Sequence, residues 1–160
     1  MPPDPTAGHS DRYRPLAAYG ALSVAFNGLF GAAVLAARRG GRLPERFGAG
    51  DTLLLGAATA QLSRLVSKDR VTSVLRAPFT RYTDDTGYGE VEEEARGTGL
   101  QRAMGELLIC QYCVAQWIAA GMVLGHAVAP RETRVVAATF TVFGVANALN
   151  VAYSAAQDRA

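Results

Sequence analysis

The sequence has 160 residues, with 16 Lys and Arg against 14 Asp and Glu and a formal net charge of +2. The length suits one domain better than two, and so small and dispersed a charge argues against nucleic-acid binding. Apolar residues make up 49% of the chain, which fits an ordinary globular protein. The class of protein therefore depends on how the apolar residues are distributed.

The amino-terminal segment divides into a polar tail and an apolar run. Residues 1–14 combine proline, small and charged residues and predict a disordered tail. Residues 16–37, LAAYGALSVAFNGLFGAAVLAA, carry no charge, and about 20 apolar residues suffice to span a bilayer. The run is too long for a cleavable signal peptide, and Arg38 and Arg39 follow it. It predicts a retained transmembrane helix.

Residues 52–66 form a weaker apolar segment that ends near Arg64. This segment spans the membrane if the Arg64 guanidinium reaches back to the interface; otherwise it is a re-entrant or interfacial helix. We favour a span, because it returns the chain to the side from which the next helix must start.

A polar region at about residues 67–106 follows. Val71, Val74, Leu75 and Phe79 are spaced to share one helical face, which predicts a short amphipathic helix on the membrane surface that Pro78 ends. Residues 82–97 hold six carboxylates without the spacing of a calcium-binding loop. They predict a solvated loop.

Two further charge-free runs, residues 107–129 and 135–157, predict two more transmembrane helices. Thr98 and Gln101 match a capping box, so the first of these helices is expected to run unbroken from about Gly99, unless Gly105 breaks it. A soluble alanine-rich bundle would show a polar stripe on each helix, and these runs show no charged stripe.

The predicted fold is therefore all-α: a polytopic helical membrane protein with four transmembrane helices and a short amphipathic interfacial helix, in a single domain over residues 15–157. Both termini and the 67–106 region then share one side of the bilayer. That side carries more basic residues than the other side, which predicts cytoplasmic termini in the bacterial inner membrane. The basic residues of the other side are Arg38, Arg39, Arg42, Arg46, Arg131 and Arg134.

Cys110 and Cys113 form a Cys-x-x-Cys pair for which three interpretations stay open. A redox pair is typically found at a helix amino terminus, whereas the predicted helix places Cys110 about three turns inside and Glu106 one turn before it. On a regular helix the two Cβ atoms are also farther apart than the ~3.8 Å of a disulfide. A metal site needs about four ligands, and His126 is too distant along the helix to add one. Burial as small apolar side chains is the third interpretation.

Two stretches resemble a known family: LSRLVSKDRVTSVLRAPF, residues 62–79, and GELLICQYCVAQW, residues 105–117. Together they are similar to small bacterial integral membrane proteins termed domain of unknown function 1360, some of which carry sporulation labels. The resemblance covers about residues 50–155. Gln111 and Ala115 depart from it, where proline and glycine are common. The motif positions that it implies are Arg64, Asp69, Arg76, Pro78, Glu106, Cys110, Cys113 and Trp117.

Two functional hypotheses follow. The sequence holds no Ser-His-Asp arrangement, phosphate-binding loop or histidine cluster, so the first is a non-enzymatic interaction or assembly component of the cell envelope. Its partners would be the lipid bilayer and other helices, in a homo- or hetero-oligomer, and it would need no cofactor. The second is a membrane thiol protein that uses Cys110 and Cys113 for redox chemistry or metal binding.

Overall fold

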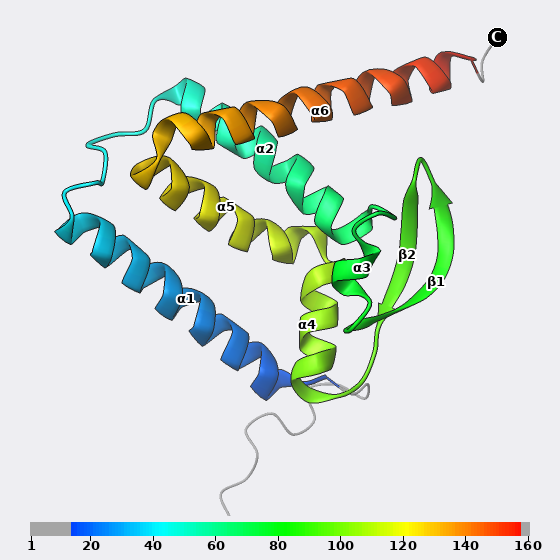
Figure 1. Cartoon of the computed structure of the whole chain (residues 1–160). Coiled ribbons are helices and arrows are strands. Elements are labelled where there is room, and N and C mark those ends of the chain that lie inside the picture. The colour runs from blue at the N-terminus through cyan, green and yellow to red at the C-terminus, as the bar shows by residue number, and fades with distance from the viewer. Residues whose placement is uncertain (1–13, 158–160) are drawn as a thin grey trace, which may run out of the picture.

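The computed structural model describes residues 14–157; the predicted amino-terminal tail lies outside this range except for Arg14. The described residues form mostly helices, together with one two-stranded antiparallel sheet (Figure 1). The elements in chain order are α1 (Leu16–Arg39), α2 (Ala49–Lys68), α3 (Ser73–Arg76), β1 (Thr80–Gly87), β2 (Glu90–Ala95), α4 (Gly99–Ile109), α5 (Gln111–Val128) and α6 (Pro130–Gln157).

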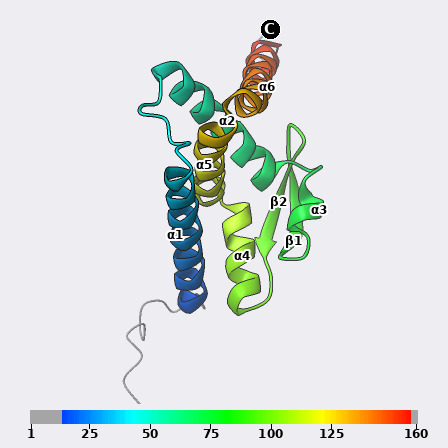
Figure 2. The same ribbon diagram turned by 60° about the vertical axis from the view of Figure 1, so that its left-hand side comes forward.

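Four long helices run back and forth between two ends of the molecule. The end of α1, the start of α2, the end of α5 and the start of α6 lie at the left of Figure 1. The start of α1 lies at the bottom of Figure 1 beside α4, as it also does in Figure 2; the end of α2 and the start of α5 lie near α3 and α4, and the end of α6 points away to the upper right of Figure 1. The polar region between α2 and α5 is therefore gathered at one end, which we call the hairpin end.

The apolar core lies where α2 packs against α5 and α6. Leu55 and Ala58 of α2 are buried against Met122 of α5 and Ala137 of α6. At the end opposite the hairpin, Asp51 accepts hydrogen bonds from Nε and Nη2 of Arg134, at 2.8 and 2.9 Å. This bidentate ion pair fixes the start of α2 against the start of α6.

Two helices, α1 and α6, are long and apolar enough to cross a membrane. A third crossing is present if α4 and α5, which are bent by 83° relative to each other, count as one broken span. In contrast, α2 does not meet this criterion, so the fourth predicted span is not confirmed.

The prediction of an unbroken helix from Gly99 to Ala129 is wrong. The helix stops at Ile109 and restarts at Gln111, with Cys110 in an extended conformation between them (φ −90°, ψ 101°). Thr98 is the residue before α4, as predicted, but its side chain makes no capping hydrogen bond. The Gln101 amide instead donates to the carbonyl oxygen of Pro78 at 2.9 Å, so the capping box is not formed.

The predicted helical fold is confirmed in the main, since the described residues are mostly helical, but the predicted acidic loop is wrong, because residues 80–95 form a β-hairpin. Its turn needs three successive residues with positive φ, Gly87, Tyr88 and Gly89, and two of them are glycine, the residue that tolerates this conformation without strain. Acidic residues are depleted in strands, which concealed the hairpin in the sequence.

The predicted amphipathic helix is reduced to the single turn of α3. Val71 lies before it, and Val71, Val74 and Leu75 are all largely exposed, so they share no buried face. The buried residue of this turn is Arg76, whose side chain is fully inaccessible to solvent.

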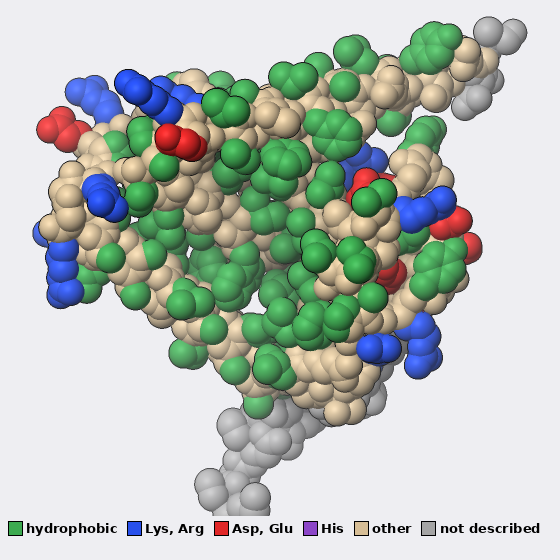
Figure 3. Space-filling view, viewed as in Figure 1, with side chains coloured by type: hydrophobic (Ala, Val, Ile, Leu, Met, Phe, Trp, Pro, Cys, Tyr) green, Lys and Arg blue, Asp and Glu red, His purple; other side chains and the backbone are tan. Residues whose placement is uncertain are grey.

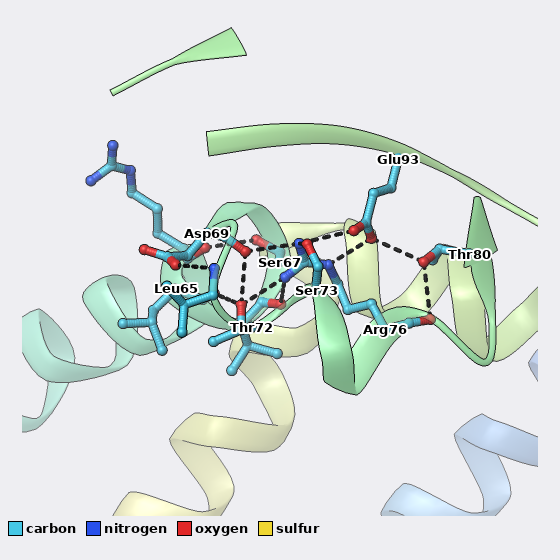
Figure 4. A network of polar contacts seen from close by, with 11 residues as sticks. Leu65, Ser67, Asp69, Thr72, Ser73, Arg76, Thr80 and Glu93 are labelled. Atoms are coloured by element: carbon cyan, nitrogen blue, oxygen red, sulfur yellow. Dashed lines mark hydrogen bonds and ion pairs between the residues drawn. The ribbon is translucent and has the colours of Figure 1, made fainter. Parts of the chain in front are cut away.

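Arg76 attaches the hairpin to the end of α2 (Figure 4). Its Nε and Nη2 atoms donate to the carboxylate of Glu93 on β2, at 2.8 and 3.3 Å. The same guanidinium donates to the main-chain oxygens of Val66 and Asp69 and to the hydroxyls of Thr72 and Ser73. All five N–H donors are thereby used, and a buried charge is tolerated only when it is paired and hydrogen-bonded in this way.

Glu93 completes the network. Burial alone would raise its pKa, but hydrogen bonds from Arg76, Ser73 and Thr80 and the charge of Arg76 hold the pKa of Glu93 below its usual value. A carboxylate with a lowered pKa in the folded state stabilises that state above its unfolded pKa. The hairpin is therefore held by an interaction that needs Glu93 ionised.

We predict that Glu93→Gln destabilises the protein by about 3–5 kcal/mol near neutral pH, because it leaves the Arg76 charge buried without a counter-charge. The stabilisation by wild-type Glu93 should be complete above about pH 4.3 and should be lost as the pH falls through the lower pKa of the folded state. Denaturant unfolding in detergent at a series of pH values measures both effects. Glu94→Gln, an exposed neighbour on the same strand, should be close to neutral; an equal effect of the two substitutions would contradict the assignment.

We also predict that Gly105→Ala destabilises the protein by about 1–3 kcal/mol, the usual range for overpacking. A Cβ atom at position 105 would overlap the carbonyl oxygen of Phe79 and lie 2.9 Å from the Cβ of Ala95, so α4 would be forced away from the base of the hairpin. Gly56→Ala is the matched control, because a Cβ there meets no atom within 4 Å. Thermal unfolding of both variants in detergent measures the difference. If Gly105→Ala were as stable as Gly56→Ala, the close contact at position 105 would be contradicted.

Candidate functional site

The eight motif residues lie in two separate groups. Arg64, Asp69, Arg76 and Pro78 lie around the attachment of the hairpin to α2. The other four, Glu106, Cys110, Cys113 and Trp117, line a cleft of about 670 Å³ between α1 and the α4–α5 bend. This cleft is the candidate functional site, and the surface is visibly hollowed between α1 and α5 (Figure 3).

The first wall of the cleft is one face of α1. Tyr19, Leu22, Ser23 and Phe26 line the cleft, and their spacing of three and four residues places them on the same side of a helix. Asn27 also reaches the cleft, with its amide donating to the carbonyl oxygen of Ser23 at 2.8 Å. The wall is apolar at its centre and carries scattered polar groups.

The opposite wall comes from α4 and α5, on either side of the bend. Ala103, Glu106 and Leu107 of α4 and Cys113, Gln116 and Trp117 of α5 line it, again at helical spacing. The ring of Trp117 meets that of Phe26 edge to face, with centroids 5.0 Å apart. This geometry is favourable for aromatic pairs and connects α1 to α5 across the cleft.

Cys110 and Cys113 form a disulfide at the bend, with their Cα atoms 5.2 Å apart. The expectation that Cys110 lies inside a regular helix, and is therefore badly placed for redox chemistry, is wrong. Cys110 is the N-cap residue of α5, and its Sγ accepts a hydrogen bond from the backbone N–H of Cys113 at 3.2 Å. A helix amino terminus favours a thiolate at this position.

The disulfide provides a physical reason for the bend. Sharp bends in helices usually have a cause such as proline or a glycine–serine pair, and residues 107–114, LLICQYCV, contain none of these residues. A regular helix holds Cβ atoms three residues apart too far from each other for a disulfide. Cys110 leaves the helical conformation, and this departure lets the two sulfur atoms meet.

The two cysteines differ in access. Cys113 is exposed and Cys110 is half-buried, so an incoming thiolate reaches the Cys113 sulfur more easily. The sulfur atom released by such an attack would be that of Cys110, which keeps the N–H of Cys113 and the start of α5 beside it. A thiolate that is stabilised in this way is the better leaving group.

A polar cluster lies at the hairpin end of the cleft. The Tyr19 hydroxyl donates to Oε2 of Glu106, and Nε of Arg102 donates to Oε1 of the same carboxylate at 3.0 Å. Arg14 lies at this end as well. The Glu106 carboxylate therefore accepts a hydrogen bond from Tyr19 and is paired with the charge of Arg102.

The other motif residues serve the hairpin attachment. Arg64 pairs with Glu90 at 2.7 Å, and Oδ1 of Asp69 accepts from the N–H of Val71 at 2.8 Å. The carbonyl oxygen of Pro78 accepts hydrogen bonds from Arg96 and Gln101. None of these contacts leaves a reactive group facing the cleft.

Residues 14–157 contain no group of three or more His, Cys, Asp and Glu side chains that could hold a metal ion. His126 lies at the opposite end of α5, with its Nε2 atom 3.6 Å from Oδ2 of Asp51. Within these residues the cysteine pair thus has no further ligand close to it.

Sequence reasoning missed Tyr19, Phe26 and Glu93. The spacing of Tyr19, Ser23 and Phe26 indicated a common helix face, but no sequence signal showed that this face meets α4 and α5. For Glu93, the glycine pair at 87 and 89 beside β-branched and aromatic residues was an available hairpin signal.

The comparisons with known proteins agree on one family. The profile of the family described as protein of unknown function (DUF1360) matches residues 54–153. The chain is also 30% identical over 105 residues to the sporulation protein YjcA of Bacillus subtilis (strain 168), an alignment that covers 64% of this chain and 89% of that protein. No solved structure matches the chain. The chain therefore belongs to the DUF1360 family of proteins of unknown function.

Proposed function

We propose that this chain is a membrane thiol–disulfide protein in which Cys110 and Cys113 cycle between the dithiol and the disulfide. The observation that carries the proposal is the position of the disulfide at the first turn of α5, in the wall of a cleft. A cysteine pair that only packs the interior of a helix needs neither a helix amino terminus nor access to a cleft.

The cycle begins when the thiolate of a substrate attacks Sγ of Cys113, the exposed sulfur. A mixed disulfide forms between the substrate and Cys113, the bond between Cys113 and Cys110 breaks, and Cys110 leaves as a thiolate. Cys110 can then attack Sγ of Cys113, which releases the substrate thiolate and restores the disulfide, or a second substrate thiolate can resolve the mixed disulfide and leave the dithiol. Each step exchanges one sulfur–sulfur bond for another.

The protein is proposed to be multi-pass in the bacterial inner membrane. The helices α1, α2, α5 and α6 alternate in chain direction across Figure 1, which supports four crossings. The 20 residues of α2 would extend about 30 Å at 1.5 Å per residue, the thickness of a hydrocarbon core. Charged side chains gather towards the two ends, with a mainly apolar surface between them (Figure 3). The bend at Cys110 places α4 across the end of the bundle, at the level of the headgroups.

We further propose that the termini and the hairpin end face the cytoplasm. This side of the protein carries more basic residues than the other side, and basic residues favour the cytoplasmic side of a membrane. The cytoplasm keeps thiols reduced, and disulfides that form there are usually transient, catalytic or redox-sensing. A cysteine pair at this end of the bundle would therefore cycle rather than act as a permanent cross-link.

A second candidate is an interaction or assembly component of the cell envelope. Ala137 is the one buried residue of α6, and Val145, Leu149 and Tyr153 remain largely exposed. Gly144, Ala148, Ala152 and Ala156 recur every four residues on this helix, a pattern that lets another helix approach closely in a membrane. The name of the Bacillus subtilis relative associates that protein with sporulation, and an assembly role for this chain is in keeping with that name.

The topology leads to a direct prediction. Reporter fusions inserted at the hairpin turn, between Tyr88 and Gly89, and at the carboxyl terminus should both report the cytoplasm, whereas an insertion in the 42–46 link should report the outside. If the hairpin and the carboxyl terminus report opposite sides, the bent α4–α5 pair does not cross the membrane. If all three locations are reversed, the orientation is wrong.

The redox function leads to a second prediction. In glutathione buffers, the Cys110–Cys113 pair of the full chain in detergent or native membranes should titrate between about −120 and −270 mV, the range of thiol–disulfide catalysts. Alkylation of free thiols followed by mass spectrometry measures this. A potential below about −300 mV, typical of structural disulfides, would overturn the redox proposal.

Single variants test the order of attack. Cys110→Ser should accumulate a mixed disulfide with glutathione at Cys113, because the resolving thiol is missing, and Cys113→Ser should accumulate much less. The double variant Cys110→Ser, Cys113→Ser also separates the two candidates. It should abolish any cellular phenotype that depends on redox cycling, while full activity of the double variant would favour the assembly role.

A further inference from the structure

We propose that the cleft between α1 and the α4–α5 bend binds the ring of a lipid-soluble quinone, which oxidises the Cys110–Cys113 dithiol. This inference rests on the proposed redox function and names the oxidant.

The cleft brings an aromatic wall and both sulfur atoms into one space. Phe26 and Trp117 line it together with Cys110 and Cys113, and Trp117 lies one helical turn after Cys113 on the same face of α5. Flat rings bind well against aromatic side chains. The volume of about 670 Å³ lies within the usual range of small-molecule sites, about 300–1,000 Å³. A bound ring would therefore lie next to the disulfide.

Polar side chains also line the cleft around this apolar centre, and such groups can hydrogen-bond the carbonyl oxygens of a quinone. Gln116, which directly precedes Trp117 and lies three residues after Cys113, lines the cleft on α5, and Ser23 and Asn27 line the facing wall on α1. The Tyr19 hydroxyl lies at the hairpin end, where it donates to Glu106. Binding sites for small molecules typically combine an apolar lining with a few such groups that fix the orientation of the ligand.

The position of the cleft favours an oxidant that is dissolved in the membrane. One wall is α1, which is long and apolar enough to cross a bilayer, and Val24 and Leu29 on other parts of this helix are largely exposed. With α1 in a bilayer, we expect the part of the cleft that α1 lines to be accessible from the lipid. The isoprenoid tail of a quinone can then stay in lipid while its ring enters the cleft.

The proposed step balances without a further reactant. The S–H bonds of Cys110 and Cys113 break and one S–S bond forms, so the pair loses two electrons and two protons. The quinone gains both electrons and both protons, and its two carbonyl groups become the hydroxyl groups of the quinol. Thiol exchange at Cys113 then returns the pair to the dithiol, and the substrate of that exchange is oxidised.

The test uses the full chain, reduced and freed of reductant, in nanodiscs under anaerobic conditions, with decyl-ubiquinone as the probe. We expect one quinol to form for each chain, measured by absorbance, with the loss of both free thiols. The Cys110→Ser, Cys113→Ser variant should form none. Trp117→Ala should slow quinone reduction about tenfold, the effect of losing one aromatic contact of roughly 1.4 kcal/mol. Phe143→Ala, a partly exposed aromatic of α6 outside the cleft, should leave the rate unchanged.

Oxidised glutathione provides the comparison that separates this inference from the redox function. It should oxidise the wild-type and Trp117→Ala proteins at similar rates, because it reaches the exposed Cys113 without entering the cleft. If glutathione oxidises the pair and the quinone does not, or if Trp117→Ala and Phe143→Ala react alike with the quinone, the quinone site is wrong and the redox function stands. If neither oxidant forms the disulfide, both are wrong.

Discussion

The arrangement of the whole hairpin end depends on the buried guanidinium of Arg76. The guanidinium donates to main-chain oxygens at the end of α2 and to the carboxylate of Glu93 on β2. If the hairpin moved away from α2, the positive charge of Arg76 would lose its counter-charge. The base of the hairpin then meets α4 at Gly105, where there is no room for a side chain. The packing of α4 on the hairpin and the disulfide at Cys110 together hold the bend between α4 and α5, and this bend forms one wall of the cleft. The Arg76–Glu93 ion pair thus helps to position the cleft, although neither residue lines the cleft.

This dependence gives the two groups of motif residues different roles. Arg64, Asp69, Arg76 and Pro78 hold the hairpin on α2, and their charges and hydrogen-bonding groups are used in doing so. Glu106, Cys110, Cys113 and Trp117 face an open cleft. Polar groups that are fully satisfied inside a protein stabilise its fold, whereas groups that line a cleft can meet a ligand. The chemistry of this protein is therefore expected in the second group.

The cleft also depends on how loosely α1 is held. The core lies among α2, α5 and α6, and α1 reaches this body through the contact of Phe26 with Trp117 and through the hydrogen bond of Tyr19 to Glu106. Both contacts border the cleft. Residues that attach α1 thus also shape the space beside the disulfide, and a ligand bound there would contact α1, α4 and α5 together.

The sequence by itself determined the apolar helices α1 and α6 and the family, because these depend on local composition and on contiguous motifs. It did not determine the hairpin, because acidic residues have a low preference for strands. The hairpin is held instead by the contact between Arg76 and Glu93, which lie 17 residues apart in the sequence. Nor did the sequence determine the bend at Cys110, where the local residues favour a continuous helix. Only the tertiary structure decided that Cys110 begins a helix, because the disulfide and the packing of α4 on the hairpin override that local preference. For the same reason, the chemistry available to the two cysteines became visible only in the folded chain.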